Sequence, residues 1–177
     1  MSQFVDVMKK TIFFPIIIIL LSCADSEKIN QEIISYEDEP ILVGEIDLLG
    51  LSKEPYKTWF DENYQTYVVD LESLQEAPFE DIEIDLFLGT WCEDSQLQVP
   101  QFYKILVQTG YDMSNFRMIA VDNHPDRDLQ SPEGEHQGMN IEFVPTFIFY
   151  REGKEIGRIV EYPEDTLEKD MARILRN

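Results

Sequence analysis

The fold is decided by a short stretch that reads Gly89-Thr90-Trp91-Cys92-Glu93-Asp94-Ser95 and continues to Pro100. An apolar run, Ile82–Leu88, precedes it and predicts a buried strand. Behind it, apolar side chains recur at steps of three to four residues, which predicts a helix; they are Val99, Phe102, Tyr103, Leu106 and Tyr111. Cys92 therefore falls at a strand-to-helix turn, where a thiolate meets the positive end of a helix.

The segment Trp91–Ser95 resembles the active-site turn of the thioredoxin superfamily, W-C-x-x-C, with Ser95 in the place of the second cysteine. Pro100 stands where thioredoxin-like proteins carry the proline that kinks the active-site helix. Val144–Thr146 matches their cis-proline segment, which packs against the active-site cysteine. The ordered motifs cover about residues 64–177. The resemblance implies an α/β, thioredoxin-like fold with a central mixed β-sheet flanked by helices.

The resemblance also implies thiol–disulfide exchange or isomerisation through Cys92. Ser95 and the helix amides would steady the thiolate, Pro145 would present the substrate, and Trp91 would form either a substrate platform or a cover over the core edge. A thioredoxin cycle needs a second thiol to resolve the mixed disulfide, which Ser95 cannot supply. The buried acid of many thioredoxins, six residues before the first cysteine, is Leu86 here. We therefore expect a monothiol, or else a non-enzymatic binding or structural protein that has kept the fold.

The charges around Cys92 leave its activation open. A helix N-terminus stabilises a thiolate by about 0.3–1 kcal/mol and at most ~2 kcal/mol, and a hydroxyl hydrogen from Ser95 would add to this. Glu93 and Asp94 oppose it, each by about 1 kcal/mol at ~4 Å under water-like screening. These contributions nearly cancel. Asp94 has a second interpretation, in which it only complements the helix terminus.

Residues 1–22 resemble a bacterial lipoprotein signal peptide. Two lysines precede an apolar core of about eleven residues, too short to span a bilayer and typical of a signal-peptide core. Leu20–Cys23 resembles a lipobox, which implies lipidation of Cys23 and cleavage before it. The alternative is an ordinary secretory signal that ends in a chance cysteine. Met8 is a better start than Met1, since Asp6 is out of place in a positively charged leader.

These features predict a protein tethered to the bacterial cell envelope by a lipid on Cys23, with its domain on the periplasmic or extracellular side. Its partners would be envelope proteins with cysteines, joined through transient mixed disulfides. The net charge of −21 argues against nucleic acid as a partner and against direct adhesion to anionic headgroups. Most of these charges are interpreted as a solvated surface.

We expect neither a cofactor nor a metal. His124 and His136 lie near several aspartates, but this segment lacks the glycine and distal glutamate of a calcium loop. A Cys/His copper site would need a second cysteine beside Cys92.

The remaining chain is divided by composition. Residues 23–40 are acidic and predict a flexible tether, and 41–63 form an N-terminal helical and aromatic extension, which either binds a ligand or caps the core. A short helix is expected after Pro55. The thioredoxin-like domain, 64–177, then has the following expected elements: strand 64–69, helix 71–77, strand 116–121, a 126–140 loop with a short helix, a hairpin of 143–150 and 154–160, and a last helix that carries Leu167, Met171, Ile174 and Leu175.

Overall fold

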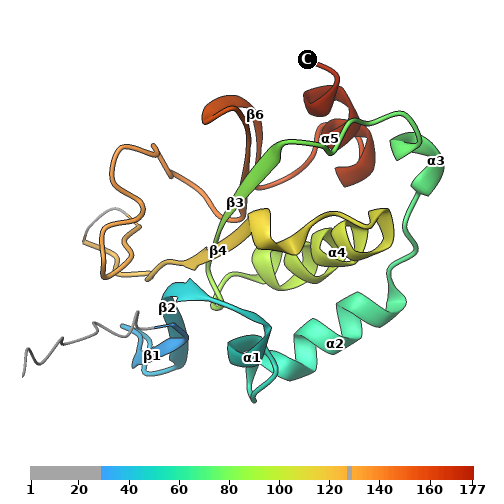
Figure 1. The fold of residues 1–177 in the computed structure, drawn as a ribbon. Coiled ribbons are helices and arrows are strands. Elements are labelled where there is room, and N and C mark those ends of the chain that lie inside the picture. The colour runs from blue at the N-terminus through green and yellow to red at the C-terminus, as the bar shows by residue number, and fades with distance from the viewer. Residues whose placement is uncertain (1–28, 127–128) are drawn as a thin grey trace, which may run out of the picture.

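The computed structural model describes residues 29–126 and 129–177 (Figure 1). The expected signal peptide, Cys23 and the first part of the expected tether lie outside these residues. Within the two described ranges, no helix has both the length and the apolar character needed to cross a membrane.

A mixed sheet of six strands forms the centre of the molecule, in the order β1-β2-β4-β3-β5-β6. Strand β3 pairs parallel with β4 and antiparallel with β5. The strands are β1 Gln31–Ile34, β2 Pro40–Ile46, β3 Ile82–Leu88, β4 Phe116–Ala120, β5 Thr146–Arg151 and β6 Lys154–Val160. The predicted α/β class, with a central mixed sheet and helices packed on it, is confirmed.

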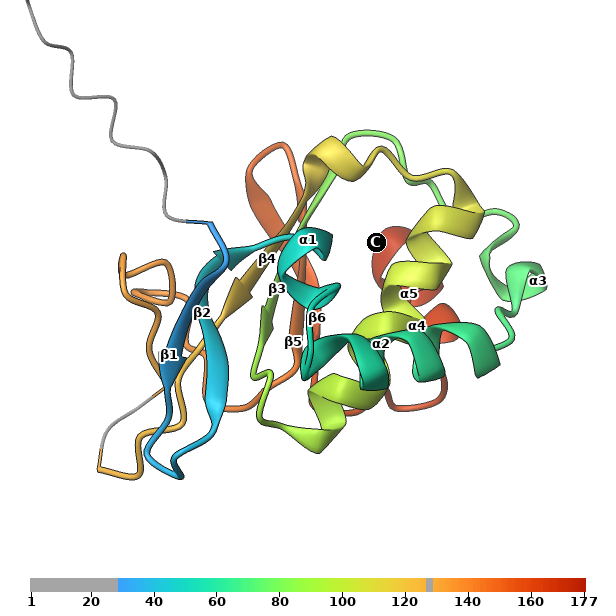
Figure 2. The same ribbon diagram turned by 90° about the horizontal axis from the view of Figure 1, so that it is seen from below.

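The helices gather on one face of the sheet, as Figure 2 shows for α2, α4 and α5. They are α1 Leu48–Leu51, α2 Tyr56–Thr66, α3 Leu71–Leu74, α4 Glu93–Thr109 and α5 Leu167–Leu175, with a 3-10 turn, η1, at Met113–Asn115. The long segment between β4 and β5 covers the other face. In the described part of 126–140 this segment consists of turns and extended chain, so the short helix expected there does not form.

Strand β3 separates two hydrophobic clusters because its side chains alternate between the two faces. Ile84 and Leu86 point into the larger cluster, which includes Phe102 of α4. The rings of Phe102 and Phe147 lie 4.3 Å apart between centroids. Phe87 points the other way, into a smaller cluster with Ile119, Val121, Ile141, Val144 and Ile148. This two-sided burial explains the continuous apolar run that precedes Gly89.

The expected tether is wrong over residues 31–40. Gln31–Ile34 forms β1, which pairs antiparallel with β2 from Gln31 opposite Val43 to Ile34 opposite Pro40. The Ser35 hydroxyl closes this hairpin, since it accepts backbone hydrogen bonds from Glu37 at 3.2 Å and Glu39 at 3.3 Å. The acidic composition concealed a local turn motif, and the described part of this segment belongs to the sheet.

The expected strand at 64–69 and the boundary at 64 are also wrong. Helix α2 continues to Thr66 because Tyr64 stacks on Phe60 one turn earlier, with ring centroids 6.1 Å apart. This i,i+4 aromatic pair outweighs the β preference of the sequence. Moreover, the expected extension supplies β2, whose Ile41 and Val43 are almost fully buried. The extension is helical and aromatic in part, but it completes the same sheet.

The other expected elements are confirmed with small changes at their ends. The helix expected over 71–77 is shorter, Leu71–Leu74. The hairpin of β5 and β6 turns at Glu152 and Gly153, whose φ values of 53° and 70° are those of a tight hairpin turn. Pro100 lies inside α4 as expected.

Candidate thiol site at the start of helix α4

Cys92 is the N-cap residue of α4, a helix of 17 residues. Its backbone is extended, with φ −90° and ψ 122°, and its amide donates to the Gly89 carbonyl at 3.0 Å. Its own carbonyl accepts the first helical hydrogen bond, from Gln96 at 2.9 Å. The thiol therefore stands between the end of β3 and the positive end of α4, as the sequence predicts.

The Cys92 thiol contacts the segment before β5. Its sulfur donates a hydrogen bond to the Val144 carbonyl oxygen at 3.3 Å. The Val144–Pro145 peptide bond is cis, as the resemblance implies. The thiol is only partly exposed and packs against the smaller hydrophobic cluster. Cys92 and Pro145, far apart in sequence, are therefore brought together in one site.

Ser95 lies beneath the turn and is fully buried. Its hydroxyl oxygen accepts the backbone N–H of Gly89 at 3.2 Å. This bond ties the first turn of α4 to the chain that leaves β3. The hydrogen bond that the sequence suggests from Ser95 to a Cys92 thiolate stays a prediction, because the Ser95 hydroxyl contacts the Gly89 amide instead.

Trp91 is anchored to the neighbouring strand. Its indole Nε1 donates to the Val121 carbonyl at 2.9 Å, and its ring packs on the smaller cluster. A methyl group on Gly89 would lie 2.6 Å from the indole Cε2 atom, so the ring rests on a position where only glycine fits. These contacts favour the interpretation of Trp91 as a cover over the core edge.

A further part of the site comes from the segment after β6, which sequence reasoning missed. The Glu161 amide donates to the Pro145 carbonyl at 2.8 Å, and the Glu161 carbonyl accepts from Gln98 of α4. The next residue, Tyr162, is 58% exposed. No local pattern signals this arrangement, because only the pairing of β5 with β6 carries residues 161 and 162 to the start of α4.

The electrostatics of this rim are anionic. The Asp94 carboxylate is the main cause that raises the pKa of Tyr162 to about 12, followed by partial loss of solvent and the charges of Glu161 and Cys92. All three charges would oppose a phenolate beside them. The Tyr162 hydroxyl therefore stays protonated at neutral pH.

The position under the thiol carries no acid, as the sequence indicates. Leu86 is fully buried among the side chains below α4. The nearest acid along β3 is Asp85, whose carboxylate accepts two hydrogen bonds from Arg117, at 2.9 and 2.7 Å. No buried proton acceptor of the thioredoxin type therefore stands at position 86.

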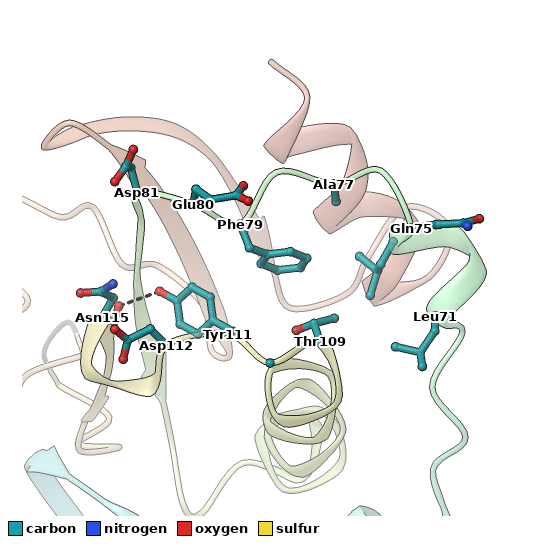
Figure 3. A pocket seen from close by; sticks show the side chains of 12 residues that line it. Leu71, Gln75, Ala77, Phe79, Glu80, Asp81, Thr109, Tyr111, Asp112 and Asn115 are labelled. Atoms are coloured by element: carbon teal, nitrogen blue, oxygen red, sulfur yellow. Dashed lines mark hydrogen bonds between the residues drawn. The ribbon is translucent and has the colours of Figure 1, made fainter.

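A separate cavity of about 710 Å³ lies at the opposite end of α4 (Figure 3). The ring of Tyr111 forms its floor, edge-on to Phe79 with 6.1 Å between the centroids. The Tyr111 hydroxyl bonds to the carbonyl oxygens of Ile82 at 2.8 Å and Asn115 at 2.9 Å. Carboxylates of Glu80, Asp81 and Asp112 stand at its rim. Neither a cysteine nor a histidine lines this cavity.

The two histidines occupy turns. His136 Nδ1 accepts the Ser131 N–H at 3.0 Å, and His124 Nδ1 accepts the Asp126 N–H at 3.3 Å. Over residues 29–126 and 129–177, no three His, Cys, Asp or Glu side chains converge as a metal site would require. The hydrogen bonds of both rings are those of loop residues.

Comparisons with known proteins bear on the fold alone. No protein-family model and no curated protein matches the sequence. Thioredoxin f2 of Chlamydomonas reinhardtii aligns at 19% identity with a TM-score of 0.33. The alignment covers 45% of this chain and 66% of the thioredoxin, so this chain spans slightly less than two thirds of that protein's length. Mitochondrial thioredoxin 3 of Saccharomyces cerevisiae aligns at 21% identity and a TM-score of 0.32, over 55% and 86%. PA1234, a Pseudomonas aeruginosa protein of unknown function, aligns at 15% identity and a TM-score of 0.47, over 81% and 96%.

Proposed function

We propose that this chain is a thioredoxin-like protein of the bacterial envelope that exchanges or isomerises disulfides through Cys92, acting as a monothiol. The observation that carries the proposal is the placement of Cys92. Its thiol is partly exposed at the start of α4 and lies 3.3 Å from the carbonyl that precedes Pro145. A helix N-terminus favours the thiolate, which is the nucleophile in such reactions.

The reaction step is a thiol–disulfide exchange. The Cys92 thiolate attacks one sulfur of a substrate disulfide, a new S–S bond forms, and the old one breaks. The departing thiolate keeps the electron pair of the broken bond and takes up the proton that Cys92 has lost. With Ser95 in place of a second cysteine, a thiol from the substrate or a partner attacks the mixed disulfide and restores Cys92. When that thiol belongs to the same substrate, the result is isomerisation without net oxidation.

The neighbouring groups have roles that follow from their contacts. The Val144 carbonyl accepts the thiol hydrogen at rest, and it becomes free for the N–H of an extended substrate once the thiolate forms. Pro145 holds this carbonyl against the thiol, and Trp91 forms a wall on the side of the smaller cluster. Ser95 fixes the turn through Gly89.

The envelope location is a proposal from the sequence. A lipid on Cys23 would tether the domain outside the cytoplasm, where disulfides persist. The test compares the native chain with Cys23→Ser in a bacterial host fed labelled palmitate. We expect label and membrane association in the native chain and release in the variant. A variant that stays on the membrane would remove the lipid anchor from the proposal.

A second candidate function is non-enzymatic, a binding or structural lipoprotein that has kept the fold. Specific contacts favour it, since the Cys92 thiol, the Ser95 hydroxyl and the Trp91 indole are each engaged with backbone groups. In this view the thiol is a packed side chain and the site binds a protein without covalent chemistry.

One experiment separates the two functions. The full-length chain with Cys23→Ser, in which Cys92 is the one remaining cysteine, is incubated with the neutral 2-hydroxyethyl disulfide. Peptide mass spectrometry then measures the adduct on Cys92. We expect the adduct to form faster in the folded chain than in the denaturant-unfolded chain at the same pH, and none in the Cys92→Ser control. Reaction only after unfolding would establish an inert thiol and favour the second function.

A further inference from the structure

Gln98 of α4 is a buried polar residue that the exchange step itself does not use. It is 4% exposed, and its Nε2 atom donates a hydrogen bond to the Glu161 carbonyl, in the segment after β6. Its Oε1 atom is also buried, and no hydrogen-bond partner for it lies within the described residues. An unpaired buried acceptor lowers stability, so a purely structural role at this position would be met better by an apolar side chain.

Glu161 connects Gln98 to the segment that contacts the thiol. Its backbone has φ 56°, a left-handed conformation that residues other than glycine adopt rarely and only where the surroundings hold them. Two hydrogen bonds hold it here: its carbonyl accepts from Gln98, and its amide donates to the Pro145 carbonyl at 2.8 Å. The residue before Pro145, Val144, accepts the Cys92 thiol at 3.3 Å. Gln98 and Cys92 therefore bind the same segment from the same helix.

Helix α4 thus contacts the chain around Pro145 at two places. The contact from the thiol to the Val144 carbonyl is lost when Cys92 becomes a thiolate or a mixed disulfide, because both forms lack the thiol hydrogen. The contact from Gln98 through Glu161 involves no atom that reacts. It also lies six positions further along the helix, about 9 Å from the thiol end. The second contact can therefore persist while the first is absent.

We infer that Gln98 is a positioning residue for disulfide exchange. Through Glu161 it holds the Val144 carbonyl in place for the backbone N–H of an extended substrate, after the thiol hydrogen has left. The inference rests on the proposed function, since it concerns the same thiol. The bonds made and broken remain those of the exchange, in which Cys92 gains a sulfur partner and the departing thiolate takes up the proton. A peptide disulfide should depend on Gln98, whereas a disulfide without a backbone should not.

The test compares two neutral disulfides that differ in backbone. One is the disulfide-linked dimer of a capped alanine-cysteine-alanine peptide, which carries backbone N–H groups, and the other is 2-hydroxyethyl disulfide, which carries none. Each is added to the full-length chain with Cys23→Ser, and adduct formation on Cys92 is timed by mass spectrometry. Each rate is divided by that of free N-acetylcysteine with the same reagent. The normalised peptide rate divided by the normalised 2-hydroxyethyl disulfide rate is the peptide preference.

Gln98→Met keeps the length of the side chain but removes the hydrogen bond to Glu161. We expect the peptide preference to fall about three- to tenfold, the range that one hydrogen bond supplies, and the rate with 2-hydroxyethyl disulfide to stay within about twofold. The midpoint of thermal unfolding should stay the same or rise, because the unpaired Oε1 acceptor is removed as well. A lower peptide preference without a loss of stability is an effect that a merely structural residue would not produce.

Three further variants locate the cause. Gln108→Met makes the same change near the other end of α4, where the side chain is exposed, and should leave the peptide preference unchanged. Glu161→Gln removes the carboxylate but keeps both backbone hydrogen bonds, so it should also leave the preference unchanged. Gln98→Asn keeps an amide on a side chain one methylene shorter. It should lower the preference as Gln98→Met does, and it replaces that variant in the test if the methionine chain does not fold.

Each outcome decides between defined conclusions. Failure of 2-hydroxyethyl disulfide to react with the folded Cys23→Ser chain contradicts the proposed function itself. With that reagent reactive, an unchanged peptide preference in the folded Gln98 variants, or an equal fall in Gln108→Met, overturns only the role of Gln98. A fall of both rates together, or loss of folding in both Gln98 variants, also overturns this role, since Gln98 would then act on the fold as a whole.

Discussion

The two ends of helix α4 differ in how their polar groups are used. At the N-terminal end, three distant segments meet around Cys92: the start of α4, the segment at Val144 and Pro145, and Glu161 after β6. At the C-terminal end a cavity of about 710 Å³ opens, and the Tyr111 hydroxyl in it is satisfied by backbone carbonyls. A hollow is therefore weaker evidence for a site than convergence of distant polar groups on a reactive atom.

The largest effect expected from this comparison is on thiol exchange. Cys92→Ser should abolish adduct formation with 2-hydroxyethyl disulfide, because the serine hydroxyl is not a nucleophile toward sulfur at neutral pH. Peptide mass spectrometry of the Cys23→Ser chain with and without this change measures it. Thermal unfolding of both chains checks that the fold is kept. A surviving adduct in the double variant would mean that the assignment to Cys92 is incorrect.

Two glycines, Gly89 before α4 and Gly110 after it, allow the cost of a steric clash to be compared with the cost of a left-handed backbone conformation. Gly89→Ala should destabilise the fold by about 3 kcal/mol, at the upper end of overpacking costs, because the new methyl group meets the rigid Trp91 ring at 2.6 Å. Gly110 has φ 71° and open space around it, so Gly110→Ala should cost only about 1 kcal/mol for the left-handed conformation. Denaturant unfolding of both variants measures which of the two substitutions lowers the free energy of unfolding more. The reverse order would contradict the packing of Trp91 on Gly89.

The cavity end is expected to be structural. Tyr111→Phe removes the hydroxyl bonded to the Ile82 and Asn115 carbonyls and should cost about 1–2 kcal/mol in unfolding free energy. It should leave the rate of Cys92 adduct formation unchanged, since the change lies at the far end of α4. Measurement of stability and rate on the same sample checks both. A slower adduct rate in a folded Tyr111→Phe chain would mean that the cavity end of α4 influences the Cys92 thiol, which contradicts the independence of the two ends.

The strand and the helix on either side of Cys92 could be predicted because their sequence signals are local and ordered. The apolar run before Gly89 specified β3, and the three- to four-residue spacing specified α4. The cis bond before Pro145 followed from the resemblance and agrees with the structure.

The sequence failed where tertiary packing decided the outcome. The first half of the strand predicted at 64–69 belongs to helix α2, which ends at Thr66, because Tyr64 stacks on Phe60 and lies near Tyr103 of α4. The hairpin of β1 and β2 was hidden by acidic residues. The contacts of Glu161 with Pro145 and Gln98 could not be predicted, since they depend on where the end of β6 lies relative to α4.

The smallest expected effect concerns acid stability at the cavity end. The Asp112 carboxylate accepts hydrogen bonds from the backbone N–H and hydroxyl of Ser114, which lower its pKa below the usual 3.8. A carboxyl group whose pKa falls on folding contributes stability that is present above 3.8 and lost as the pH falls through the folded value. Asp112→Asn keeps a capping side chain but cannot titrate, so its acid unfolding curve should be slightly flatter in that range. An NMR titration of the Asp112 carboxyl measures the cause directly. A midpoint at or above 3.8 would mean that the Ser114 bonds do not hold the turn beside Tyr111, and the cavity end would then be less fixed than the thiol end.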